Sequence, residues 1–180
     1  MPIDEYISSS KKWDWETPND WFEFLDRLFD FSLDVAADPF NAKCKYYYTE
    51  KDNALSQSWK TENRWFCNPP WGNAYTRQTG YTMEDWISKA VLEYRYGNEG
   101  VMFAPMNCET GWWQDYVKTC PAVFFPRGRI EFGHPDLEGS SQPTKGTAIW
   151  LFIQKLTDDQ VYSLYKKGWA VRTIDPYMRT

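Results

Sequence analysis

The sequence predicts a single-domain α/β protein with a mostly parallel central sheet and helices on both faces. Short apolar segments alternate along the chain with segments whose apolar residues recur at helical spacing, which is the pattern of an α/β sheet. A chain of 180 residues with 42% hydrophobic content is long enough for one sizeable core. No internal repeat or linker divides the chain, so we expect one domain at 13–180 behind a polar, flexible arm at 1–12.

The first half of the chain predicts one helix and three strands. Asn19 or Asp20 can cap a helix that runs to about Asp30 and carries its apolar residues on one face. In order along the chain, the other segments expected here are a strand at 31–35, a strand within 42–48, an irregular stretch at 51–59, a buried strand at 64–67 and a mobile loop at 72–80.

Turn residues and helical spacing organise the second half. Thr82 and Asp85 predict a capped helix over 82–96, and Gly97 ends it. The other segments expected here are a strand at 100–105, a short helix from 110, a strand at 122–125, a hairpin arm from 127–132, a loop at 133–146, a strand at 147–153, a helix at 158–167 and a terminal strand near 169–174.

Composition excludes some classes of function. The net charge of -5 argues against a protein that binds nucleic acid mainly through bulk charge. The four cysteines form no C-x-x-C pair and the single histidine, His134, has no partner at metal-ligand spacing, so no metal is expected. The start of the chain lacks the basic and apolar run of a signal peptide, and we expect a cytoplasmic protein with free thiols.

The most informative stretch is Asn68-Pro69-Pro70-Trp71, directly after the strand predicted at 64–67. The two prolines lock successive φ angles and remove two backbone donors. A rigid turn with free acceptors, followed by a flat aromatic side chain, suits an exocyclic amino group on a planar base. The base would stack on Trp71 and donate to the Asn68 side-chain oxygen and the Pro69 carbonyl. A plain loop with Trp71 in the core is the competing interpretation.

Asp34 ends the strand predicted at 31–35, beside the small residues Val35-Ala36-Ala37. Ligands bind open α/β sheets at the carboxyl ends of strands, and both Asp34 and Asn68 occupy such positions. We therefore expect them to share one site. A carboxylate there can bind an ammonium group or a ribose hydroxyl, although an exposed turn aspartate is an equally good interpretation of this segment alone.

Several short motifs follow one another in a specific order between Trp15 and Ile153. They are Thr17-Pro18, FSLDVAA at 31–37, NAKC at 41–44, Ala54-Leu55, Trp59, WFCNPPW at 65–71, Trp86, GRIEF at 128–132 and the strand at 149–153. Their joint order resembles the phage-type DNA N6-adenine methyltransferases, a Dam-like family that uses S-adenosylmethionine. The resemblance implies a Rossmann-like class I methyltransferase fold. One departure is that Ala36 and Ala37 stand where the wider class has a glycine-rich turn.

The resemblance also implies roles for residues. Asp34 would hold the methionine end of S-adenosylmethionine, and the motif at 68–71 would grip the target adenine. The implied cofactor-binding residues are Thr17, Pro18, Asp34, Val35, Ala36 and Asn68, and the implied catalytic residues are Asn68, Pro69, Pro70 and Trp71. Glu50 or Asp52 is expected to contact the cofactor, and spacing does not choose between them.

Double-stranded DNA is the expected partner, with the target base flipped out of the duplex. Recognition loops near 72–80 and 127–146 are expected to contact it through Arg127, Arg129 and Lys145. Arg64, Lys43 and Lys45 are weaker candidates. Two alternatives stay open at this point. One is a methyltransferase of the same fold acting on RNA, cytosine N4 or another amino group, and the other is a non-catalytic binding protein with this fold.

Overall fold

The computed structural model describes residues 15–133 and 145–172. The arm expected at 1–12 and most of the loop expected at 133–146 lie outside this part. Within it, seven strands form one sheet in the order β2-β1-β3-β4-β6-β5-β7. The strands are β1 (Phe31–Asp34), β2 (Tyr46–Tyr47), β3 (Arg64–Cys67), β4 (Gly100–Pro105), β5 (Ala122–Pro126), β6 (Thr147–Phe152) and β7 (Gly168–Arg172).

The two halves of the sheet differ in strand direction. β2, β1, β3 and β4 pair in parallel, whereas β6 runs antiparallel to both β4 and β5, and β7 antiparallel to β5. Leu33 of β1 lies opposite Tyr46 on one side and Trp65 on the other. The predicted α/β fold with a parallel centre is confirmed, and the antiparallel pairs are confined to one side of the sheet.

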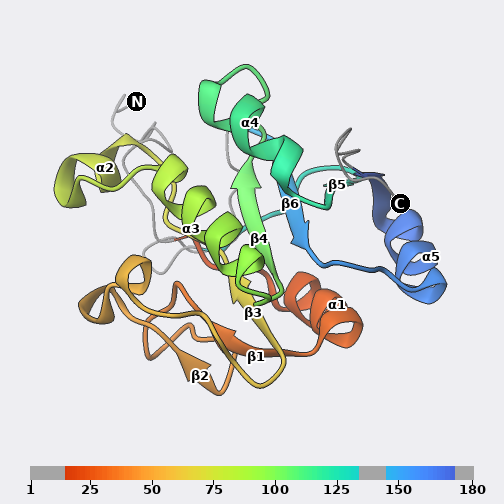
Figure 1. Ribbon diagram of the computed structural model, residues 1–180, viewed down its shortest axis with the longest axis horizontal. Helices are drawn as coiled ribbons and strands as arrows, with labels where there is room; N and C mark the ends of the chain where they lie inside the picture. The colour runs from red at the N-terminus through yellow and green to blue at the C-terminus, as the bar shows by residue number, and fades with distance from the viewer. Residues whose placement is uncertain (1–14, 134–144, 173–180) are drawn as a thin grey trace, which may run out of the picture.

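Helices cover both faces of the sheet, as expected (Figure 1). Alternate residues of β4 point to opposite faces: Met102 packs with α3 (Met83–Arg95) and α4 (Gly111–Tyr116), whereas Phe103 packs with α1 (Asn19–Phe29) and α5 (Asp158–Lys167). The capping box predicted for α3 is present, because Thr82 and Asp85 bond each other's backbone N–H. No helix in the described ranges has the length and apolar character that a bilayer crossing demands.

The prediction of a loop at 72–80 is wrong, because Asn73–Thr79 forms the helix α2. Asn and Thr are poor helix formers, so composition alone favoured a loop. Gly72 precedes the helix with a φ of 108°, and Gly80 ends it in the left-handed region with a φ of 80°. Tyr75 of this helix is buried in the core beside α3. Packing of one side chain thus stabilises a helix that propensity does not favour.

One other segment differs from expectation. The stretch predicted to be irregular after β2 contains two 3₁₀ turns, Glu50–Asp52 and Ala54–Ser56. Gly133, which follows the arm expected from 127–132, forms an isolated antiparallel bridge with Glu16, so a segment from the start of the domain lies against this arm. The return half of the expected hairpin falls outside the described residues, and the hairpin stays a prediction.

Candidate functional site

A cavity of about 370 Å³ opens where the strand order reverses, at the carboxyl ends of β1, β2 and β3. The chain passes from β1 to β2 on one side and returns to β3 on the other, which is the switch point where open α/β sheets bind ligands. The cavity is lined by Trp15, Val35, Ala36, Ala37, Asp38, Asn41, Tyr48, Thr49, Glu50, Asn53, Ala54, Asn68, Pro70, Tyr75, Thr79, Tyr81 and Trp86.

The turn after β1 forms one side of this cavity. The Val35 N–H donates to the Phe66 carbonyl of β3 at 2.9 Å, and the Ala37 N–H donates to the Tyr48 carbonyl at 3.0 Å. These bonds tie the turn to both neighbouring strands. Val35 and Ala36, both predicted cofactor contacts, line the cavity, and the small alanine side chains let a ligand approach the backbone.

Asp34 lies beneath that turn and is only 3% exposed. Its Oδ1 accepts from the Ala36 N–H at 3.3 Å, and its Oδ2 accepts from the Lys43 N–H at 3.1 Å. Burial raises the pKa of Asp34 from 3.8 to about 6, although these two backbone N–H groups lower it in part. The carboxylate therefore shapes the loop beside the cavity, and unlike Asn68 it does not itself line the cavity.

Thr17 and Pro18, also predicted to bind the cofactor, do not line the cavity. Thr17 is 4% exposed, and its hydroxyl has no hydrogen-bond partner within the described chain. Pro18 stands immediately before α1 as its N-cap residue. Trp15, two residues before Thr17, is the part of this segment that lines the cavity.

Asn68 does line the cavity, at the carboxyl end of β3. Its side-chain Nδ2 donates to the Trp15 main-chain carbonyl at 2.7 Å. A carbonyl oxygen only accepts, so the amide nitrogen must face Trp15 and Oδ1 must point the other way. Within the described residues no hydrogen bond uses Oδ1 or the Pro69 carbonyl. Oδ1 of Asn68, a residue that lines the cavity, is thus available to a ligand, whereas Pro69 is buried and does not line the cavity.

Trp71 occupies a different environment from Asn68. Its ring is half-buried and packs edge to face on Phe132, with 5.3 Å between ring centroids. It contacts the core cluster on the α1 face of the sheet and does not line the cavity. Its Nε1 is buried and has no hydrogen-bond partner in the described residues. Pro70 lies between the two environments, and its side chain lines the cavity.

The opposite wall is aromatic and was not predicted from the sequence. Tyr75 of α2, Tyr81 and Trp86 of α3 face the turn after β1 across the cavity. Asn53, which adopts a φ of 50°, donates through Nδ2 to the Tyr81 hydroxyl at 3.1 Å. Tyr75 was missed because its helix was predicted as a loop. The spacing of Tyr75 and Thr79, four residues apart as on one face of a helix, was the signal that could have found this wall.

The structure separates the two acidic candidates after β2. Glu50 lines the mouth of the cavity. The Asp52 carboxylate is engaged in a capping box, where its Oδ2 accepts from both the N–H and the hydroxyl of Thr49. These hydrogen bonds lower the pKa of Asp52. Of these two candidates only Glu50 lines the cavity, where Asp38 contributes a second carboxylate that was not predicted.

Comparison with known proteins now decides the family. A model of the DNA N-6-adenine-methyltransferase (Dam) family matches residues 6–172, which is nearly the whole chain. The chain belongs to the Dam family.

Two similar proteins accompany that match. The chain is 28% identical over 165 residues to the DNA N-6-adenine-methyltransferase of Haemophilus phage HP1, covering 88% of this chain and 90% of that protein. It is 41% identical over 63 residues to YfdM of Escherichia coli K12, provisionally named a methyltransferase, covering 32% of this chain and 69% of YfdM. The fold and the cavity described above thus belong to a Dam-family protein.

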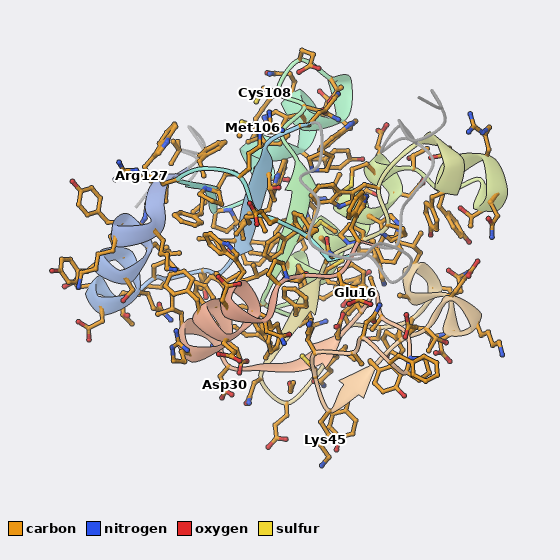
Figure 2. All side chains as sticks on the ribbon, turned by 180° about the vertical axis from the view of Figure 1, so that it is seen from behind. Glu16, Asp30, Lys45, Met106, Cys108 and Arg127 are labelled. Atoms are coloured by element: carbon orange, nitrogen blue, oxygen red, sulfur yellow. The ribbon has the colours of Figure 1, made fainter. Side chains whose placement is uncertain are left out.

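The basic residues expected to contact DNA do not gather at the cavity of this Dam-family chain. Arg127 and Arg129 are exposed, and the Arg127 N–H donates to the Lys167 carbonyl beside β7. Figure 2 shows Arg127 near α5, well separated from Glu16 at the middle of the view. Lys145 is exposed, with its Nζ 4.0 Å from Glu109.

The weaker basic candidates have structural partners. Arg64 forms a salt bridge with Glu99 at 3.0 Å, at the amino end of β3 and so at the opposite edge of the sheet from the cavity. Lys43 Nζ donates to Asn19 Oδ1, and Lys45 Nζ lies 5.0 Å from the centre of the Tyr46 ring. None of these three side chains lines the cavity of the Dam-family domain.

The cysteine beside the motif is poorly suited to act as a nucleophile. Cys67, adjacent to the motif, is fully buried, and burial raises the pKa of its thiol well above the ordinary value. A thiol that resists ionisation is a poor nucleophile. This agrees with the prediction that residues 64–67, which include Cys67, form a buried strand. No cluster of metal-ligating side chains occurs in the described residues.

Proposed function

We propose that this Dam-family protein transfers a methyl group from S-adenosylmethionine to the N6 amino group of adenine in DNA. One observation carries the proposal. The motif residue Asn68, with its Oδ1 unused, lines the same cavity as the turn after β1 and the carboxylate of Glu50. A cofactor held at the β1 and β2 ends would thus lie beside an acceptor suited to an amino group.

The residues present fit the cofactor. A cavity of about 370 Å³ with aromatic and small apolar walls suits a nucleoside-sized ligand. Asp34 is a buried carboxylate without a full counter-charge, so an ammonium group nearby would favour its ionised form. Glu50 at the mouth would accept hydrogen bonds from ribose hydroxyls. Val35 and Ala36 would let the cofactor lie against the backbone.

The motif residues then act on the target base. S-adenosylmethionine, when bound, supplies a methyl group on a sulfonium. Asn68 Oδ1 and the Pro69 carbonyl would accept the two hydrogens of the adenine amino group and turn its lone pair towards that methyl. The amino nitrogen would take the methyl group as its bond to sulfur breaks, and one amino proton would pass to water. Orientation and fixed dipoles supply most of the acceleration.

Flipping the adenine out of the duplex costs a few kcal/mol. Stacking on an aromatic ring returns about 1–3 kcal/mol per base. We propose Trp71, the last residue of the motif, for this role. Its edge-to-face contact with Phe132 would hold the ring in place. Arg127, Arg129 and Lys145 are proposed to contact the DNA backbone.

Replacing Asn68 tests the proposal. We expect Asn68→Ala to abolish methyl transfer to unmethylated DNA while the dissociation constant for S-adenosylmethionine stays within about threefold, as measured by calorimetry. Asn63→Ala is the matched control, because Asn63 is exposed and bonds Asp30 at the opposite edge of the sheet. Full activity of Asn68→Ala would overturn the mechanism.

Analysis of the product distinguishes the alternatives. Digestion of methylated DNA and identification of the modified base should yield N6-methyladenine; N4-methylcytosine, or transfer to RNA alone, would contradict the assignment. A non-catalytic binding protein would show a rise in melting temperature with S-adenosylmethionine and no transfer to any nucleic acid.

A further inference from the structure

We propose that residues 15–17, here called the strap, form a positioning element that holds the Asn68 amide in its reactive orientation. The inference rests on the proposed function and deepens it. The strap crosses from the start of the domain to the end of β3, where the Trp15 carbonyl accepts the hydrogen bond from Asn68 Nδ2 at 2.7 Å. Its other attachment is Gly133, far along the chain.

The orientation of an asparagine amide decides what it can do for an amino group. With Nδ2 bonded to Trp15, Oδ1 is left to accept a hydrogen from the substrate. If the amide turned by 180°, its NH₂ group would face the NH₂ group of the base, and two donors would meet. A carbonyl acceptor on one side therefore selects the productive orientation, and it does so before the substrate arrives.

The strap is clamped on the side away from Asn68. The Glu16 N–H donates to the Gly133 carbonyl at 2.9 Å, and the Gly133 N–H donates to the Glu16 carbonyl at 3.0 Å. Ile130 and Phe132, which lead into Gly133, are buried at 1% and 0% exposure. The position of the Trp15 carbonyl is thus defined by a two-bond bridge to a segment that the core holds in place.

This arrangement also joins two functional parts of the domain. Gly133 ends the segment that carries Arg127 and Arg129, which we propose to contact DNA. The strap connects that segment to Asn68 through a continuous path of three main-chain and side-chain hydrogen bonds. Trp15 of the strap lines the cavity, but the walls from β1, β2 and α3 are built from other segments. We therefore expect loss of the Glu16–Gly133 bridge to affect the chemical step more than cofactor binding.

Two substitutions of Gly133 distinguish the effect of losing its N–H hydrogen bond from the effect of adding a side chain. Gly133→Pro removes the N–H that bonds Glu16. Gly133→Ala keeps it, and the added Cβ would meet the Glu16 side chain only at 3.6 Å, an ordinary contact. Gly111→Pro is the control for the same exchange elsewhere, because Gly111 is the first residue of α4, where proline is tolerated. Glu16→Pro breaks the bridge from its other side.

We expect Gly133→Pro and Glu16→Pro each to lower kcat at least about tenfold, since a small misplacement of a reacting group has large kinetic effects. The KM for S-adenosylmethionine and its calorimetric Kd should change less than about threefold. Gly133→Ala should keep most of the parent's kcat, and the kcat of Gly111→Pro should equal that of the parent. An unchanged kcat in both bridge-breaking variants, with the fold intact by circular dichroism, would overturn the inference.

A measurement without turnover keeps this inference separable from the proposed function. The Asn68 side-chain NH₂ resonances, assigned by their loss in Asn68→Ala, should show slow hydrogen exchange in the parent and fast exchange in Glu16→Pro. If exchange is equally fast in both, the strap does not hold the amide and the inference fails. If exchange responds as expected but the parent transfers no methyl group, the proposed function fails while the positioning contact stands.

Discussion

Replacing Asp34 by asparagine removes a buried charge while it preserves the shape of the side chain. Asp34 is 3% exposed, and burial raises its pKa from 3.8 to about 6. A shift of roughly two pKa units corresponds to about 3 kcal/mol of differential free energy between the two protonation states. At pH 7 the ionised carboxylate therefore lowers the stability of the ligand-free protein by about that amount.

The sign of the pH dependence follows from linkage. Because the pKa of the folded state exceeds that of the unfolded chain, the native protein holds a proton that the unfolded chain releases between about pH 4 and pH 6. The contribution of Asp34 to the free energy of unfolding falls as the pH rises through this window, and it stays at the lower level above pH 6.

Asparagine cannot reproduce both hydrogen bonds. One oxygen keeps a backbone N–H, and we expect it to be the Lys43 N–H at 3.1 Å rather than the Ala36 N–H at 3.3 Å. The lost bond costs about 1 kcal/mol at every pH. Asp34→Asn should therefore be less stable than the parent by about 1 kcal/mol at pH 4 and more stable by about 2 kcal/mol at pH 7.

Urea denaturation from pH 4 to pH 8 measures this crossover, and at pH 7 the melting temperature should rise by about 4–8 °C. The same variant should bind S-adenosylmethionine at least about tenfold more weakly by calorimetry, because the proposed ammonium partner is gone. Asp26→Asn is the control, since Asp26 also accepts a backbone N–H, from Phe31, and belongs to α1 rather than to the turn beside the cavity. Equal destabilisation by Asp34→Asn at every pH would refute the reasoning.

Three further predictions concern other parts of the molecule. Glu50→Gln should raise the Kd for S-adenosylmethionine about tenfold by calorimetry through loss of charge-assisted hydrogen bonds, with no change in melting temperature without the cofactor; an unchanged Kd would remove Glu50 from the binding site. Gly100→Ala should lower the free energy of unfolding by at least about 2 kcal/mol in urea, because its Cβ would lie 2.0 Å from the Trp65 ring, and parent-like stability would contradict this packing. Iodoacetamide at pH 8 should modify exposed Cys108 in the native protein and buried Cys67 only after unfolding, as peptide mass spectrometry can show; rapid native labelling of Cys67 would mean that β3 is accessible.

Local patterns were sufficient for most of the scaffold. The strand β3 was predicted with its observed bounds, and the capped start of α3 was predicted from Thr82 and Asp85. Both depend on interactions within a few residues, namely apolar continuity and a reciprocal capping box. The helix α2 was not predicted, because its residues favour loops and its stability depends on burying Tyr75 against distant parts of the chain.

The sequence by itself determined that Asp34 and Asn68 follow strands of an α/β sheet, and the order of its short motifs indicated the Dam family. Only the tertiary structure decided which side chains meet. It placed Glu50 rather than Asp52 at the cavity, directed Trp71 towards Phe132, and brought the Trp15 carbonyl against the Asn68 amide. The physical reason is that these contacts join residues far apart in the chain, and neither propensity nor periodicity encodes the direction in which a side chain finds such a partner.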